Sequence, residues 1–335
     1  MDFQHLVADG ELLEEMLQRR SELVRPAVDG LEALEGMGDG GRLAEGLVRM
    51  NEGVYPPGED SGLEAIVLRF TRPVFFVRGS DVTPPADSDT FAEGESAVIT
   101  ARMAAGQAAL KAAVPSVGRV DLRNHRFDWV GTGWVVAPGV AVTNRHVAEL
   151  FAASDAGSFP FRLTGDDRRV KASLDWRREY RSPEESVVAV RKVLWINPDD
   201  EADVALLQIA DADEDGRPAP PPVPLMTQAE VNASLGSWVA VVGYPAQSAY
   251  NDASDQQRIF DGVYNVKRVA PGTVASVSPD GQFTHNATTL GGNSGSVVMD
   301  LVGGKAVGLH FGGFEGDRNL AVQAPVLAAL VAAHS

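Results

Sequence analysis

The sequence contains no cysteine among its 335 residues. A disulfide framework, a thiol nucleophile and a thiolate metal site are therefore excluded. It also lacks an apolar run of the roughly 18 residues that a membrane-spanning helix needs. The first residues, MDFQHLVADGELLEE, are acidic and lack the apolar core of a secretion signal. We therefore expect a cytoplasmic protein with no membrane segment.

Positive charge is also scarce, with 29 Lys and Arg against 46 Asp and Glu, for a net charge of -17. An acidic surface repels phosphate groups, so we expect no nucleic-acid partner. One basic stretch, residues 168–181 with Trp176 and Tyr180, is interpreted as a solvated strand face, and a patch for an acidic partner is the alternative. His125 and His285 have no spacing typical of metal ligands, so we expect neither a metal nor a cofactor.

The composition, 44% hydrophobic and 22% charged, is that of an ordinary globular protein able to bury a sizeable core. Residues 1–110 carry helical patterns, at 9–25 and again at 96–114, and two apolar runs, AIVLRF and VFFVRG. We interpret this region as a helical or mixed segment. Runs this apolar need a covering surface, so we expect the segment to dock on the rest of the chain or on a protein partner, in a regulatory or recruiting role. A passive folding scaffold is the alternative.

The sequence pattern changes near residue 116, where short β-type runs recur with Gly and Pro between them. This pattern predicts an all-β barrel or sandwich over residues 116–335. The proline run RPAPPPVP at 217–224 is interpreted as an extended linker between two β halves. The apolar segment APVLAALVAAH at 324–334 predicts a short C-terminal helix.

A serine surrounded by small residues, Ser294 in TTLGGNSGSVV, raises the question of catalysis, although a plain loop between strands is the alternative. A serine hydroxyl becomes a nucleophile only beside a general base, which itself needs an orienting partner. His146, in VTNRHV after two β runs, is the candidate base. Asp203, directly before an apolar strand, is the candidate partner, with Asp199 and Asp200 as alternatives.

In this order, the segments resemble the trypsin-like (chymotrypsin-fold) serine peptidases, particularly bacterial members without disulfides. The resemblance covers roughly residues 116–335. It rests on five segments, GTGWVV with VTNRHV, DVALLQI, VAVVGYP, GGNSGSVV and GLHFGG.

The resemblance implies a mainly β fold of two six-stranded antiparallel β-barrels with a C-terminal helix. It further implies a serine endopeptidase that acts on a protein or peptide substrate through an acyl-enzyme, with His146, Asp203 and Ser294 as the triad. The N–H groups of Gly292 and Ser294 would form the oxyanion hole. The backbone of Phe311, Gly312 and Gly313 would pair with the substrate as an added strand.

The specificity pocket is expected beside Thr288 and Thr289, where a trypsin-type pocket would carry a carboxylate, so cleavage after Lys or Arg is not expected. Thr289 and His310 resemble the pocket of glutamyl endopeptidases, which implies cleavage after acidic residues. A structural role for His310 is the alternative, and the net charge of -17 opposes the approach of acidic substrates. Asn293 replaces the aspartate that pairs with a newly cut N-terminus in digestive members, so activation by that route is not expected.

Two other readings remain. One is a catalytically idle trypsin-like module that binds peptides by strand addition. The other is an esterase of the α/β-hydrolase fold, which the histidine-first order opposes because that fold places its serine first.

Overall fold

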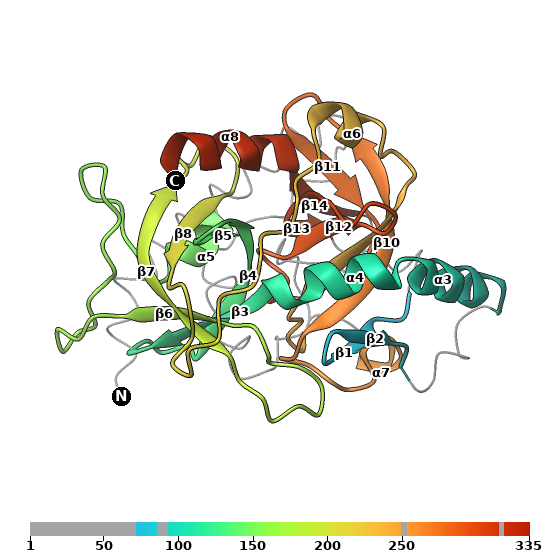
Figure 1. The fold of residues 1–335 in the computed structure, drawn as a ribbon, viewed down its shortest axis with the longest axis horizontal. Helices are drawn as coiled ribbons and strands as arrows, with labels where there is room; N and C mark the ends of the chain where they lie inside the picture. Colours follow the sequence, from blue (N-terminus) through green and yellow to red (C-terminus); the bar gives the residue numbers. More distant parts are fainter. Residues whose placement is uncertain (1–71, 86–92, 249–252, 315–317) are drawn as a thin grey trace.

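The computed structural model describes residues 72–85, 93–248, 253–314 and 318–335, and the structural statements below concern these residues (Figure 1). The helix expected over residues 9–25 and the apolar run AIVLRF lie outside them.

The first half of the predicted β region closes into a barrel. Its strands run in the order β3-β4-β5-β8-β7-β6, and every pairing is antiparallel. The strands are β3 (Val117–Arg123), β4 (Trp129–Ala137), β5 (Val140–Thr143), β6 (Lys171–Asp175), β7 (Val187–Ile196) and β8 (Ala205–Ile209). Valine-rich strands suit this closure because β-branched side chains pack well on a pleated surface. Trp134, Leu174 and Leu206 are fully buried in the core.

The second half forms another closed ring of six antiparallel strands. The order is β11-β14-β13-β12-β9-β10, and pairing between β10 and β11 closes it. The strands are β9 (Trp238–Gly243), β10 (Arg268–Val277), β11 (Gln282–His285), β12 (Val297–Asp300), β13 (Ala306–Phe314) and β14 (Arg318–Gln323). The prediction of two six-stranded antiparallel β-barrels is confirmed.

A hairpin from the upstream segment extends the second barrel. Strand β1 (Phe75–Arg78) pairs with β10, with Phe75 opposite Val269, and β2 (Asp81–Thr83) pairs with β1. The helix expected over 96–114 is present as α3 (Glu93–Ala105) and α4 (Gln107–Ala113), with a break at Gly106. A short 3-10 turn, η5 (Val114–Ser116), then leads into β3. Ile99 and Leu110 are buried, so these helices contribute to the common core.

Two buried cations hold this upstream segment against the barrels. Lys267, whose side chain is fully buried, donates to the carbonyl oxygens of Val114 and Trp176 at 3.0 and 2.6 Å. Arg268, equally buried, donates through Nε to the carbonyl oxygen of Phe75 at 3.1 Å. Buried charges require such partners, because an unpaired one would cost several kcal/mol.

The linker and the C-terminal helix connect the two barrels on the outside. The proline run lies between β8 and β9, where the backbone N–H of Val223 donates to Val135 of the first barrel and that of Ala306 in the second barrel donates to Pro224. Helix α8 (Ala324–His334) confirms the expected C-terminal helix. It follows β14 of the second barrel and extends over the first (Figure 1). His334 near its end stacks on Trp195 of the first barrel, with ring centroids 3.7 Å apart.

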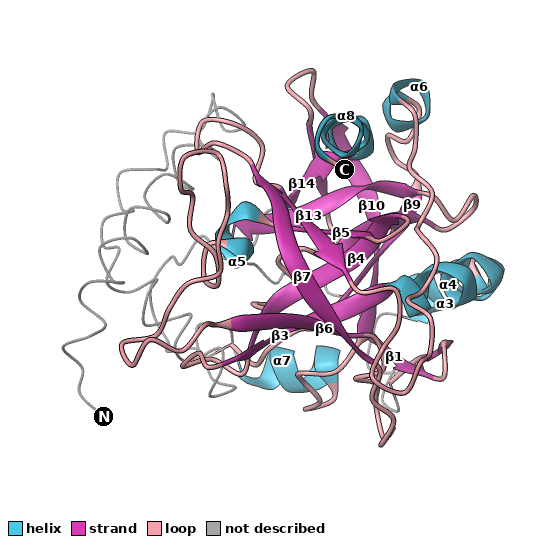
Figure 2. Ribbon diagram, turned by 60° about the vertical axis from the view of Figure 1, so that its left-hand side comes forward, coloured by secondary structure: helices cyan, strands magenta, loops and turns pink. Residues whose placement is uncertain are grey.

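Three further short helices complete the described chain: α5 (Arg145–Ala148), α6 (Gln228–Asn232) and α7 (Ala253–Phe260). Figure 2 shows α6 and α8 on one side of the strands and α7 on the opposite side. Among the described residues, no helix is long and apolar enough to cross a membrane.

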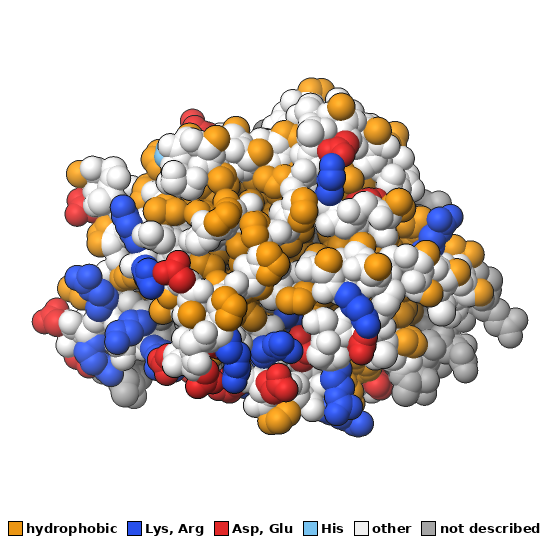
Figure 3. Space-filling model, in the orientation of Figure 1, with side chains coloured by type: hydrophobic (Ala, Val, Ile, Leu, Met, Phe, Trp, Pro, Cys, Tyr) orange, Lys and Arg blue, Asp and Glu red, His pale blue; other side chains and the backbone are white. Residues whose placement is uncertain are grey.

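The basic stretch at 168–181 is paired with acidic neighbours. Arg168 lies 2.7 Å from Asp166, and Arg178 lies 3.1 Å from Glu185. Trp176 is buried and therefore does not belong to a solvated face. On the face drawn in Figure 3, acidic and basic side chains alternate toward the lower left, while hydrophobic ones gather across the middle.

Candidate active site

His146 lies in a buried turn that follows β5. The chain leaves β5 at Thr143 and enters the single-turn helix α5 through Asn144. The side-chain amide of Asn144 donates to the backbone oxygen of Asp203 at 2.9 Å. This bond fastens the histidine turn to the segment before β8. It thereby brings His146 to Asp203, which lies 57 positions further along the chain.

His146 and Asp203 contact each other directly. The His146 Nδ1 atom lies 2.6 Å from Asp203 Oδ2, and the backbone N–H of His146 donates to Asp203 Oδ1 at 3.1 Å. The two residues are 6% and 5% exposed, so solvent screens the contact little. Because a carboxylate accepts from Nδ1–H, a neutral His146 carries its proton on Nδ1, and Nε2 is the nitrogen that can accept a second one.

The alternative carboxylates are engaged elsewhere or lie at the surface. Asp199 Oδ1 lies 3.5 Å from Nε of Arg145, which also donates to the carbonyl oxygen of Pro198. Asp200 is exposed. Among the three candidates, Asp203 is therefore the one that the fold brings to His146.

Ser294 lies in a loop whose backbone conformation requires glycine. Gly292 and Gly295 have φ angles of +90° and +86°, a region that side chains disfavour. A Cβ atom on Gly295 would also lie 2.0 Å from the carbonyl oxygen of Thr132. The loop can press against β4 only because this Cβ is missing, and the N–H of Thr132 then donates to the Ser294 carbonyl oxygen at 2.9 Å.

Two anchored carbonyl groups orient the N–H groups expected to form the oxyanion hole. The Gly291 oxygen accepts from Ala246 N–H at 2.6 Å, and the Asn293 oxygen accepts from Ser296 N–H at 2.8 Å. These peptide bonds are trans, so the N–H groups of Gly292 and Ser294 point away from those anchors. Their directions are therefore fixed before any substrate binds.

The serine loop and the histidine turn meet at Gly131 of β4. A Cβ atom on Gly131 would lie 3.0 Å from the Ser294 carbonyl oxygen and 3.0 Å from Cγ2 of Val147. Val147 directly follows His146 in the chain. The fold thus brings the loop that carries Ser294, from the second barrel, and the residue that follows His146, from the first barrel, to the same point of β4.

The expected pocket residues are buried beside the serine loop. Thr288, Thr289 and His310 are each at most 1% exposed. The N–H of Gly295 donates to the His310 oxygen at 2.9 Å, so β13 runs directly alongside the loop that carries Ser294. The Thr289 hydroxyl is buried and has no hydrogen-bond partner among the described residues.

A second histidine, His285, stands behind His310 and was not expected in the pocket. Its Nε2 atom lies 3.2 Å from His310 Nδ1, and its Nδ1 accepts from the backbone N–H of Ala287 at 3.3 Å. Burial, and then the charge of His310, hold the pKa of His285 well below its usual range. A neutral His285 with an occupied Nδ1 carries its proton on Nε2 and donates to His310, so a neutral His310 presents Nε2–H. No local spacing links two histidines 25 positions apart, which is why the sequence alone did not find the pair.

Strand β13, which is expected to bind substrate, extends past the end of its pairing with β12. Strand β12 pairs with β13 only as far as Leu309, whereas β14 pairs with the opposite edge as far as Phe314. The register shifts between His310 and Gly312, which places a bulge at Phe311. Such an edge can take up an extended peptide as an added strand.

Asn293 has a structural partner within its own loop. Its side-chain amide donates to the Leu290 carbonyl oxygen at 3.0 Å, and its Oδ1 lies 3.4 Å from the Ser296 hydroxyl. The side chain is buried and closes the turn that precedes Ser294. Asn293 thus stabilises the loop through neutral hydrogen bonds.

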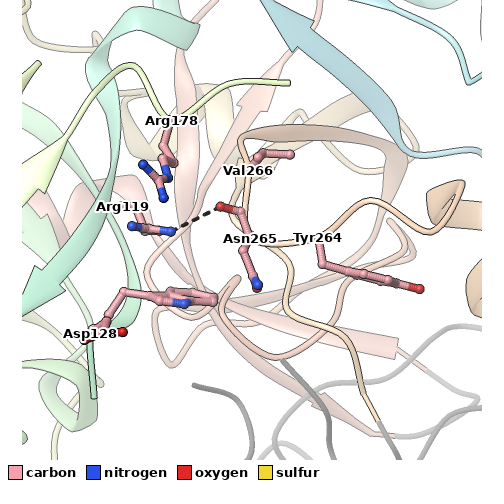
Figure 4. Close-up of a pocket in the computed structure, with 7 residues that line it drawn as sticks. Arg119, Asp128, Arg178, Tyr264, Asn265 and Val266 are labelled. Carbon is pink, nitrogen blue, oxygen red and sulfur yellow. Dashed lines mark hydrogen bonds between the residues drawn. The ribbon is translucent and has the colours of Figure 1, made fainter. Parts of the chain in front are cut away.

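A cavity of about 360 Å³ lies between residues of the first barrel and the segment 264–266 that precedes β10 (Figure 4). Arg119 and Arg178 lie side by side on one side of it, opposite Asn265 and Tyr264, and Arg119 donates to the carbonyl oxygen of Asn265 at 3.3 Å. Trp129 forms part of its wall, and a Cβ atom on Gly292 would lie 2.6 Å from the same ring. The indole of Trp129 therefore separates the cavity from the oxyanion loop.

Within the described ranges, no group of three or more His, Asp or Glu side chains is arranged to hold a metal ion.

The chain is similar to known proteins in sequence and in structure. A family model described as the trypsin-like peptidase domain matches residues 131–309. A probable serine protease of Lysobacter enzymogenes is 29% identical over 307 residues, which cover 83% of this chain and 76% of that protein. Among solved structures, the active form of a protease from M. tuberculosis is 20% identical, with a TM-score of 0.43 over 69% of this chain and 85% of that one. A serine endoprotease from Yersinia pestis is 17% identical, with a TM-score of 0.44 over 68% of this chain and 65% of that one.

Proposed function

Because this chain belongs to the trypsin-like peptidase domain family, we propose that it is a serine endopeptidase in which Ser294, His146 and Asp203 act as nucleophile, general base and orienting carboxylate. The observation that carries the proposal is the buried contact of 2.6 Å between His146 Nδ1 and Asp203 Oδ2. It fixes the imidazole in the tautomer that a general base requires.

The proposed reaction proceeds in two steps. The Ser294 oxygen attacks the scissile carbonyl carbon while its proton passes to Nε2 of His146, and the carbonyl electron pair moves to the oxygen. Collapse of this intermediate breaks the C–N bond, and the leaving amine takes the proton from His146. Water then repeats the sequence on the acyl-enzyme, which releases the acid and restores Ser294.

The N–H groups of Gly292 and Ser294 would stabilise the negative oxygen. Support comes from the two anchored carbonyl groups, which fix the orientation of these donors in advance. Preorganised donors are effective because they need no rearrangement when charge develops, and one of them typically contributes about 10²–10³ in rate.

A fluorophosphonate probe followed by peptide mapping tests the nucleophile. We expect one adduct, on Ser294, and none in the Ser294→Ala or His146→Ala chains. Ser234→Ala is the control, because Ser234 is a buried serine outside this loop and its loss should leave labelling intact. An adduct on another serine would overturn the assignment. Peptide binding without any adduct would instead favour the idle, strand-binding module.

We further propose that the peptidase prefers acidic residues on the acyl side of the cleaved bond. Two observations support this preference: the buried Thr289 hydroxyl has no partner among the described residues, and His285 orients His310 to present Nε2–H. A carboxylate would accept from both groups.

A peptide-library digest tests this preference by comparing cleavage after Glu, Leu and Arg. Predominant cleavage after Glu or Asp is expected, and His310→Ala should reduce it by roughly tenfold or more, since each lost hydrogen bond to a charge is worth about 1.5–3 kcal/mol. Predominant cleavage after Arg or Lys would exclude the acidic pocket. A preference for aliphatic residues would make His310 a structural residue.

A further inference from the structure

An arginine of the upstream segment touches the wall of the proposed specificity pocket. Arg72 lies three residues before β1 and is only 5% exposed. Its backbone N–H donates to the Thr288 hydroxyl at 3.4 Å, and that hydroxyl lies 3.5 Å from the Arg72 carbonyl oxygen. The two residues are 216 positions apart in the chain.

The side chain of Arg72 reaches the same wall at a second point. Its guanidinium donates to both the side-chain oxygen and the carbonyl oxygen of Asn286, at 2.5 and 3.2 Å. Its Cζ atom lies 5.4 Å from the centroid of Trp238, so an aromatic ring flanks the cation. One arginine therefore spans the wall from Asn286 to Thr288.

This wall has no regular secondary structure of its own. Residues 286–290 follow the end of β11 and belong to neither a helix nor a strand. One backbone hydrogen bond ties them to β10, from the Asn286 N–H to the Thr273 oxygen at 3.2 Å. Side-chain contacts add to it: Asn319 donates to the Ala287 oxygen at 2.7 Å, and the Thr273 N–H donates to Asn286 Oδ1 at 2.7 Å. Arg72 supplies the remaining described support from outside the barrel.

The hairpin anchors Arg72 firmly enough to serve this role. The N–H of Val74 donates to the Ile259 oxygen at 3.1 Å, and β1 pairs with β10 directly after it. Arg268, buried beneath this segment, donates to the carbonyl oxygens of both Val74 and Phe75. Arg72 thus extends from a strand-anchored backbone toward a wall that has no regular secondary structure.

We propose that Arg72 is a specificity-determining positioning residue, which holds Asn286 and Thr288 so that the pocket selects the acyl-side residue of the substrate. This inference rests on the proposed peptidase function, because it assigns Thr288 to the wall of that pocket. Part of the selectivity of the peptidase is then supplied by the segment that precedes it in the chain.

Peptide binding to the full chain carrying Ser294→Ala tests this role without requiring turnover. The probes are fluorescein-labelled peptides that end in Glu, Asp, Leu, Ala or Arg and are otherwise identical. Fluorescence anisotropy gives the Kd for each, and the ratio between the tightest and the weakest measures selectivity. We expect a ratio of at least tenfold, which Arg72→Met should reduce by about fivefold or more.

Two further variants keep the result interpretable. Arg78→Met is the control, because Arg78 is the exposed last residue of β1, the strand that follows Arg72, and its ratio should stay within twofold. Arg72→Lys retains the charge and one donor group, so it should fold even where Arg72→Met does not, and it should lose selectivity to an intermediate extent.

Unchanged ratios in both Arg72 variants would overturn the inference, as would a flat profile in the chain that retains Arg72. A structural role alone would lower the melting temperature and weaken all five peptides equally. A missing fluorophosphonate adduct in the chain with Ser294 would contradict the proposed function, and the binding ratios would remain measurable.

Discussion

Asp199, Asp200 and Asp203 all precede β8, yet the fold assigns them different surroundings. Asp199 pairs with Arg145, Asp200 faces solvent, and Asp203 accepts two hydrogen bonds from His146. In a triad, the carboxylate holds the imidazole in the correct tautomer and stabilises its charged form. Of the three aspartates, the one that contacts Nδ1 should therefore have the largest effect on kcat when it is replaced.

We expect Asp203→Asn to lower kcat by about 10⁴, because an amide in this place favours the wrong tautomer of His146. Asp200→Asn is the matched control and should change kcat by less than about twofold, since surface substitutions have small effects. Steady-state kinetics on a cleaved peptide, with circular dichroism to check folding, measure both. A larger effect at Asp200 than at Asp203 would mean that the wrong carboxylate has been assigned.

His285 should make the stability of the protein depend on pH. Burial holds its folded-state pKa well below the unfolded value of about 6.5. As the pH falls below that value, the unfolded chain binds a proton that the folded chain excludes. The free energy of unfolding should therefore decrease, by up to about 1.4 kcal/mol per pH unit.

Urea denaturation at pH 7.5 and pH 5.5 measures this dependence. His285→Gln should remove the corresponding part of the decrease, because glutamine does not titrate. His334→Gln, near the C-terminus, is the control and should retain the pH dependence of the unmodified chain. Equal pH dependence in all three chains would show that His285 does not titrate in this way.

At the scale of elements, the loop between β11 and β12 can adopt its conformation only with glycine at position 292. A Cβ atom on Gly292 would lie 2.3 Å from the Tyr244 carbonyl oxygen, in addition to the strain of a φ of +90°. Tyr244 follows β9 and is fully buried, so it cannot easily withdraw. The loop itself would have to move, and with it the N–H of Gly292.

Gly292→Ala should therefore lower kcat/KM by about 10²–10³, the usual cost of losing one oxyanion donor. Gly139→Ala is matched to it, because Gly139 has a φ of +73° and nothing within 4 Å of its Cβ position. That variant should lose only about 1 kcal/mol of stability and keep its activity. Comparable losses of activity in both would attribute the effect to general destabilisation.

At the scale of the molecule, the upstream segment and the barrels share one core. The upstream segment supplies β1, the buried Ile99 and Leu110, and carbonyl oxygens that accept hydrogen bonds from Lys267 and Arg268. Without them, two buried cations would lose hydrogen bonds and an apolar face would meet solvent. Removing one partner of a buried charge typically costs about 3–5 kcal/mol, a large share of the stability of a domain.

We accordingly expect a fragment of residues 116–335 to be insoluble or unfolded. A fragment of residues 72–335 is the matched control, since it keeps all of these contacts, and it should fold and react with the fluorophosphonate. Expression yield, circular dichroism and labelling compare the two. Equal labelling of the shorter fragment and the full chain would show that the upstream segment is dispensable.

Local patterns in the sequence predicted part of the architecture, and the resemblance to the trypsin-like peptidases supplied the rest. Apolar runs separated by Gly and Pro predicted an all-β barrel or sandwich, and the resemblance specified two six-stranded barrels. The glycines around Ser294 predicted a tight turn, because turn conformation depends on neighbours in the chain. The same rules predicted the C-terminal helix at 324–334 and the helix at 96–114, apart from its break at Gly106.

The tertiary structure supplied the partnerships between distant residues. The choice of Asp203 for His146, the pairing of His285 with His310, and the contact of Arg72 with Thr288 join residues 57, 25 and 216 positions apart. A polar side chain has the same local pattern whether its partner is water or a buried group from another strand. Only closure of the barrels brings these groups within hydrogen-bond distance, and burial then makes each pairing obligatory.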